Sequence, residues 1–224
     1  MTLYVSLIVE GHSEAGGATE RLLHRIWKEL LVAPIRLQVL TPSRCKRDSF
    51  INPKHPEFGA KVEEASLKLT QRLRREQEAK GLLLLLLDAE KDCPVELAPK
   101  LLTAAQTVRG DIDITCVFAK QMLENWIVAG ASTLAGINDL PDSLPTRDHP
   151  ENGSGKGWLK ARFGPPNLGR TYKETVDAKV FVEKMDLREC HQNSRSFRKL
   201  CKELEARLPP PPPEPPPPPE LPTE

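Results

Sequence analysis

A run of six consecutive leucines at residues 82–87 constrains the fold of this chain more than any other feature. Gly81 precedes the run and Asp88 ends it. Leucine favours helices, but the run is short for a buried helix and far too short to cross a bilayer. A short apolar run between a glycine and an acidic, proline-containing turn is typical of a central strand buried on both faces. The run therefore predicts a buried parallel strand.

Strand-like and helix-like segments alternate around this run. Strands are expected at residues 3–9, 35–40 and 112–119, which are apolar and rich in β-branched residues. Helices are expected at residues 22–31, 62–73 and 95–108, and residues 41–58, with three prolines and mixed charge, are expected to form a surface loop. This alternation predicts an α/β fold with a mainly parallel sheet flanked by helices.

The pattern changes after Ala129. Residues 1–129 are expected to form the α/β core, and residues 130–208 a loop-rich and helical part that packs on it. Amphipathic helices are expected at about 175–185 and from Ser194, a suitable N-cap, onward. Residues 209–224 hold two runs of five prolines separated by Glu214, which predicts a disordered polyproline tail.

The composition gives little global attraction to nucleic acid or membrane. Lys and Arg total 32, Asp and Glu total 31, and the formal net charge is +1, so nucleic-acid binding would need a local patch. The five cysteines are odd in number and form no CxxC pair, which indicates reduced thiols. With no secretory-signal pattern and no apolar run long enough for a bilayer, a cytoplasmic protein without a membrane partner is expected.

Acidic residues gather where a parallel sheet binds its ligands. Six of them follow the first, third and fourth expected strands: Glu10, Glu14, Asp88, Glu90, Asp92 and Glu124. Ligands of open α/β sheets bind outside the carboxyl ends of the strands, where converging carboxylates repel one another unless a cation neutralises them. Carboxylate oxygens suit Mg²⁺ or Mn²⁺, and such an ion can activate water for attack on a phosphodiester. The pattern predicts a metal site.

Each of these acids also has a structural interpretation. An acidic residue after a strand is often a helix N-cap, which the helix dipole favours. Both interpretations stay open for Glu14, Asp92 and Glu124, whereas Glu10 and Asp88 directly end apolar strands and are favoured as metal ligands.

Lys156 lies in an expected glycine-rich loop at residues 153–157 and is the third predicted catalytic residue beside Glu10 and Asp88. Its ammonium group would contact a scissile phosphate as a point charge. An ordinary solvated lysine is the alternative.

Several ordered motifs carry a family resemblance. In residues 8–14 an expected strand ends at Glu10-Gly11, and this segment resembles the first motif of Toprim domains. Residues 87–94 are similar to the second Toprim motif, which is Asp-x-Asp after a strand. Over residues 2–208 the chain resembles a bacterial domain-of-unknown-function family of small Toprim-like proteins. Further matching segments are Glu124-Asn125-Trp126 and residues 155–159, 172–177 and 185–198.

This resemblance implies a Toprim-like sheet in which Glu10 and Asp88, with Glu90 or Asp92, hold Mg²⁺ or Mn²⁺, and Glu14 and Glu124 support the site. Such relatives are often encoded beside AAA or ABC-type ATPases in apparent phage-defence operons. The resemblance therefore implies a nuclease or phosphoryl-transfer effector with an ATPase partner and a nucleic-acid substrate. The alternative is a non-catalytic interaction subunit that binds the ATPase or nucleic acid.

The chain departs from the Toprim-like pattern in three places. Glu90 replaces the usual second Asp, Lys91 replaces another acid, and residues 15–17 lengthen the first turn. Because Lys91 lowers the local negative charge, one metal ion is expected rather than two.

Overall fold

The sheet at the centre of the fold is fully parallel. The computed structural model describes residues 1–11, 17–145, 147–163 and 171–210. Its five strands are β1 (Thr2–Val9), β2 (Arg36–Val39), β3 (Ser43–Arg44), β4 (Ala79–Asp88) and β5 (Asp113–Ala119). The order is β2-β1-β4-β5, with β3 paired beside the end of β1, and every pairing is parallel. The predicted α/β fold with a mainly parallel sheet is confirmed.

The leucine run forms the buried part of β4, with each leucine at most 2% exposed. Because side chains alternate along a strand, Leu83, Leu85 and Leu87 enter one hydrophobic cluster, and Leu82, Leu84 and Leu86 enter another on the opposite face. Both faces of this strand are covered, which explains why its sequence is apolar throughout rather than alternating.

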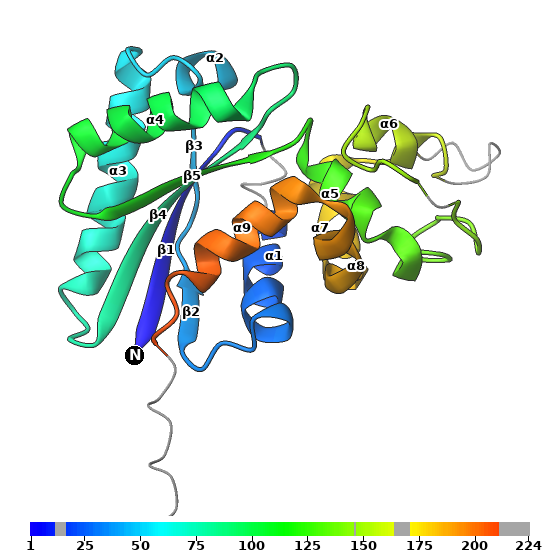
Figure 1. The fold of residues 1–224 in the computed structure, drawn as a ribbon, viewed down its shortest axis with the longest axis horizontal. Helices are drawn as coiled ribbons and strands as arrows, with labels where there is room; N and C mark the ends of the chain where they lie inside the picture. The colour runs from blue at the N-terminus through cyan, green and yellow to red at the C-terminus, as the bar shows by residue number, and fades with distance from the viewer. Residues whose placement is uncertain (12–16, 146, 164–170, 211–224) are drawn as a thin grey trace, which may run out of the picture.

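Helices cover the two faces of the sheet (Figure 1). The helices α3 (Pro56–Leu73) and α4 (Pro94–Val108) pack on one face. The other face is covered by α1 (Thr19–Arg25), by its π-helical continuation η2 (Ile26–Leu30) and by α9 (Arg195–Glu205). No helix in the described part of the chain has the length and apolar character needed to cross a bilayer.

The segment at residues 41–58 is more ordered than the sequence indicated. It contains β3, the one-turn helix α2 (Arg47–Phe50) and the start of α3, so the expectation of a surface loop was wrong. In the sequence Pro56 indicated a loop, but it lies in the first turn of α3, where proline is tolerated. Phe50 is fully buried and anchors α2 to the core.

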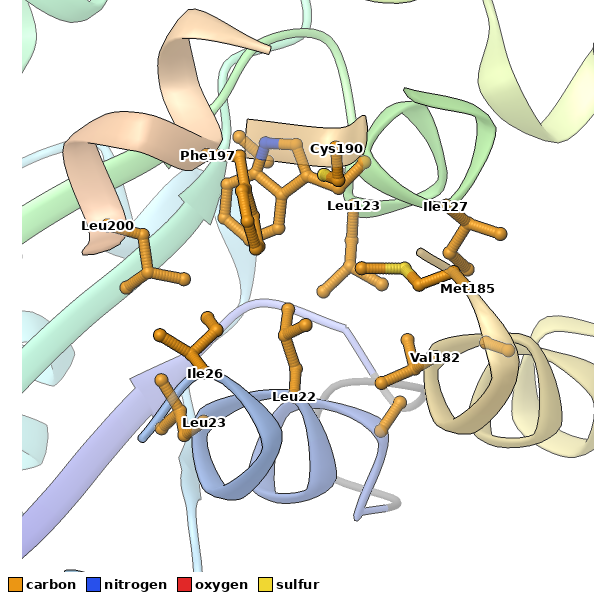
Figure 2. Close-up of a cluster of buried hydrophobic side chains, with 14 of the residues drawn as sticks. Leu22, Leu23, Ile26, Leu123, Ile127, Val182, Met185, Cys190, Phe197 and Leu200 are labelled. Atoms are coloured by element: carbon orange, nitrogen blue, oxygen red, sulfur yellow. The ribbon is translucent and has the colours of Figure 1, made fainter. Parts of the chain in front are cut away.

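Short helices follow β5 along the chain. They are α5 (Leu123–Ala129), the 3₁₀ turn η3 (Ala131–Thr133), α6 (Gly155–Lys160), α7 (Glu174–Lys184), α8 (Leu187–Asn193) and α9. Figure 2 shows Leu22, Ile26, Leu123, Met185 and Phe197 meeting in a single buried cluster. The cluster joins α1, α5 and the C-terminal helices to the sheet.

Candidate functional site

The carboxyl ends of β1, β4 and β5 lie side by side and carry the predicted site residues. Val9 pairs with Leu86, and Asp88 pairs with Ala119. Glu10 therefore follows β1 close to the end of β4. The predicted site residues that the structure describes form two groups on either side of Asp88, which we call the first and second arms of the site. The first arm holds Glu10, Glu90 and Asp92, and the second holds Glu124 and Lys156.

The first arm is an acidic cluster organised around Arg47, the first residue of α2. Arg47 Nη1 donates to Glu10 Oε2 at 2.9 Å and to the carbonyl oxygen of Asp88 at 2.8 Å. Its Nε lies 3.3 Å from Glu90 Oε2, and its Nη2 pairs with the Asp92 carboxylate. One guanidinium group thus binds three of the predicted metal ligands.

Burial and neighbouring charges act in opposite directions on the pKa values of this cluster. Burial raises the pKa of Glu10, although Arg47 pulls it in the opposite direction. Burial lowers the pKa of Arg47, but Glu10, Glu90 and Asp92 outweigh that effect and raise it. Arg47 therefore stays charged, and its single guanidinium group is shared among three carboxyl groups.

The Asp88 side chain serves a different element. Its Oδ1 accepts a hydrogen bond from the backbone N–H of Leu123 at 2.9 Å, at the start of α5. A carboxylate there satisfies an amide that has no partner inside the helix and interacts favourably with the helix dipole. One oxygen of Asp88 thus has a structural contact with α5, and its role as a metal ligand stays a prediction.

The second arm contains Glu124, Tyr172, Lys156 and Glu174. Glu124 is 4% exposed, and its Oε1 accepts a hydrogen bond from the Tyr172 hydroxyl at 3.1 Å. Burial raises the pKa of the Glu124 carboxyl. Lys156 Nζ lies 2.5 Å from Glu174 Oε2. Lys156 is thus an ion-paired residue in the first turn of α6, and the expectation of a glycine-rich loop there was wrong.

The charge of Lys156 interacts with acidic residues of this arm and with Asp88 of β4. Burial lowers its pKa, but the bond to Glu174 and the charges of Glu174, Glu124 and Asp88 raise it overall. The Asp88 side chain also contacts the start of α5, the helix that carries Glu124. The two arms meet at the end of β4.

Asn125 and Gly155 hold the two helices of the second arm together. The Asn125 side chain donates to the carbonyl oxygens of Pro150 and Gly153 and accepts from the Gly155 amide at 3.1 Å. A Cβ at Gly155 would lie 2.6 Å from the Asn125 nitrogen. The glycine lets α6 approach α5 closely, which brings Lys156 towards Glu124.

The loops at this edge carry strained backbone. Glu90 has φ of 46° and Gln121 has φ of 67°, values that non-glycine residues seldom adopt. The Glu90 amide donates to the Gln121 carbonyl at 2.9 Å, so the two strained residues support each other across the loops after β4 and β5. Such strain costs on the order of 1–3 kcal/mol and gathers at functional sites.

The predicted site is thus brought together in part. Glu10, Glu90 and Asp92 converge on Arg47, whereas Glu124 and Lys156 lie in the second arm, and Glu14 lies outside the described residues. Within the described ranges, no three His, Cys, Asp or Glu side chains are arranged to hold a metal ion. Sequence reasoning missed Arg47, Tyr172 as the partner of Glu124, and Glu174 as the partner of Lys156.

The fold and site define an α/β protein with a parallel sheet and a charged site at the carboxyl ends of its strands. Residues 9–205 match the family described as a domain of unknown function (DUF4276), and the chain belongs to that family. The match begins at the last residue of β1 and covers the other four strands, both arms of the site and the C-terminal helices. Comparisons with curated proteins and with solved structures found no match.

Proposed function

We propose that this DUF4276 protein is a Mg²⁺- or Mn²⁺-dependent nuclease or phosphoryl-transfer enzyme that acts at the carboxyl edge of its sheet. The observation that carries the proposal is the convergence of Glu10, Glu90 and Asp92 on one cation, the Arg47 guanidinium. Three carboxylates that face one point need positive charge there. Arg47 supplies it in this structure, and a divalent ion of matching ligand chemistry would supply more.

The three carboxylates match such an ion in ligand type, since carboxylate oxygens are the ligands that Mg²⁺ and Mn²⁺ prefer. In the described residues they are arranged around Arg47 and not around a metal position, so metal binding would require them to rearrange. Glu10, Glu90 and Asp92 would hold the metal, with Asp88 beside them at the end of β4. When bound, the ion would supply Lewis-acid activation of a phosphate ester and of water.

The second arm has a separate role in this proposal. Lys156 would exchange its partner Glu174 for a substrate phosphate, to which it would contribute a single positive charge. Glu124, buried against Tyr172, would hold the start of α5 and keep Lys156 charged.

The proposal includes the Toprim-like relationship and a partner. Support for the relationship comes from a glutamate that follows β1 and an aspartate that ends the neighbouring strand β4. An AAA or ABC-type ATPase would be the partner and nucleic acid the substrate, and a cleavage assay with both present tests them together.

A non-catalytic interaction subunit is the second candidate. One observation favours it: Arg47 already neutralises part of the acidic cluster. A metal-dependent cleavage assay on nucleic acid, with and without an AAA or ABC-type ATPase as candidate partner, separates the two candidates. Cleavage that chelation abolishes supports the enzyme.

The first test is Asp88→Asn and Glu10→Gln, which remove charge with little change of shape. Mg²⁺ or Mn²⁺ should raise the melting temperature of the wild type but not of either variant, because a ligand that binds only the native state stabilises it by mass action. Glu205→Gln, at an exposed position on α9, is the control and should respond like the wild type. Equal metal-induced shifts in all four proteins would refute the metal site.

A further inference from the structure

The strand β5 lies at the edge of the sheet but has the character of an interior strand. It ends the order β2-β1-β4-β5, so its outer side presents backbone N–H and C=O groups that no other described strand pairs with. Residues 114–119 are nevertheless all buried and include no charged residue or proline, the usual protection of an edge. At the opposite edge, β2 exposes Arg36 and Gln38. The sequence of β5 therefore suits a strand with a neighbour on both sides.

A groove of about 830 Å³ follows this edge. Residues 114–118 of β5 form its floor, and the helices α4 and α9 form its two walls (Figure 1). The two helices pack on opposite faces of the sheet. A further strand in the groove would therefore be covered on both faces, as β5 is.

The two walls of the groove differ in chemistry. The α4 wall is apolar and consists of Pro94, Val95, Ala98, Pro99 and Leu102. The α9 wall is polar and consists of Arg195, Ser196, Lys199, Glu203 and Arg207. Because side chains of a strand alternate between the faces of a sheet, a strand added beside β5 would direct every second side chain to the apolar wall and the others to the polar wall.

The charge of the groove favours an acidic ligand. Its charged residues are four basic and two acidic ones, namely Lys120, Arg195, Lys199, Arg207, Glu151 and Glu203. Both acids already accept hydrogen bonds within the protein, Glu203 from Thr115 at 2.8 Å and Glu151 from Ser194 at 2.7 Å. Lys120 and Arg195 are exposed. Positive charge at the polar wall is thus available to a ligand.

We propose that this groove binds an extended segment of a partner protein as an additional strand beside β5, and that apolar and acidic residues alternate in this segment. The apolar side chains contact α4, and the acidic side chains contact α9. Main-chain hydrogen bonds to β5 supply the affinity, and the alternating side chains supply the specificity. This interaction goes beyond the proposed function and requires no metal ion.

The first experiment measures peptide binding to the full chain by fluorescence anisotropy. The labelled probe peptide has four valines alternating with three glutamates between Gly-Ser ends. It should bind saturably, and the same peptide with lysine in place of glutamate should bind at least tenfold more weakly. If the glutamate peptide does not bind, or binds no better than the lysine peptide, the proposal is overturned.

Backbone methylation tests strand pairing and needs no protein variant. Alternate amides of an added strand face β5, and the remaining amides face away from it. Two versions of the glutamate peptide, each N-methylated on one of these alternate sets, should therefore differ at least tenfold in affinity. Equal affinities would refute strand pairing.

A charge reversal tests the polar wall. The double variant Lys120→Glu with Arg195→Glu should bind the glutamate peptide at least tenfold more weakly than the wild type and the lysine peptide more tightly. The matched control is Lys100→Glu with Arg74→Glu, two exposed positions that do not line the groove. It should bind the glutamate peptide like the wild type. Equal affinities of the two double variants would contradict the proposed recognition of acidic side chains.

Two other occupants of the groove give different results. If a second copy of the chain filled it, sedimentation velocity would show a dimer that the double variant Lys120→Glu with Arg195→Glu dissociates. If residues 211–224 filled it, a synthetic peptide of that sequence would displace the labelled glutamate peptide. Either result would overturn the assignment to a partner protein, and a monomer without such displacement would support it.

Discussion

Gly155→Ala tests the close approach of α6 to α5 that positions Lys156. The added Cβ would lie 2.6 Å from the Asn125 nitrogen and the Glu124 carbonyl carbon, and 2.8 Å from the Glu124 oxygen. These are backbone atoms, so no side-chain rotation relieves the overlap. Overpacking of this kind costs about 1–3 kcal/mol, and the gain from replacing a helical glycine offsets about 0.5–1 kcal/mol of it. A net loss of about 1–2 kcal/mol is expected.

Urea unfolding measures this loss. The midpoint should fall with an unchanged slope, and the melting temperature should fall by about 2–8 °C for a protein of this size. Gly157→Ala is the matched control in the same helix, because its Cβ would lie 3.3 Å from the Ser154 side-chain oxygen and not against backbone. It should be neutral or slightly stabilising. If Gly155→Ala proved as stable as Gly157→Ala, the close packing of α6 on α5 would be refuted.

Two further expectations concern acid stability and thiol reactivity. Burial raises the pKa of Glu203, but hydrogen bonds from Lys199, Thr115 and Arg207 outweigh it and lower the pKa to about 2. The ionised Glu203 carboxylate therefore stabilises the folded protein fully above pH 4.5, the pKa of a glutamate in the unfolded chain, and this contribution is lost as the pH falls towards 2. Between neutral pH and pH 2, the free energy of unfolding of Glu203→Gln should fall by up to about 3 kcal/mol less than that of the wild type. A fall equal to that of the wild type or of Glu205→Gln would contradict this expectation. Only Cys93 of the five cysteines is exposed, and burial raises the pKa of Cys116 to about 12. One thiol should thus react quickly with Ellman's reagent in the native protein and all five after unfolding; several fast native thiols would contradict the packing.

The sheet could be predicted from the sequence because its signals are local. The leucine run has a strand's length, and the glycine before it and the acidic turn after it bound it on both sides. The short helices α5, α6 and α8 were not predicted, since six or seven residues are too few to show a full amphipathic repeat. Their stability comes from tertiary packing rather than from their own sequences.

Only the candidate site residues at the ends of strands could be predicted from the sequence. Glu10 and Asp88 were predicted because each directly follows an apolar run. Arg47 sits between Lys46 and Asp48, and three charged residues in succession look like a solvated surface. Its role depends on α2 returning to the end of β1, a long-range contact that leaves no periodic mark in the sequence.

The shared cluster of Figure 2 makes the sheet and the C-terminal helices one cooperative folding unit. Leu22 and Ile26 of the N-terminal half are fully buried together with Phe197 of α9. A fragment that ended at Ala129 would leave this apolar surface in water, where each large side chain costs about 1.5–3 kcal/mol. The acidic edge and the helices that frame it should therefore unfold together.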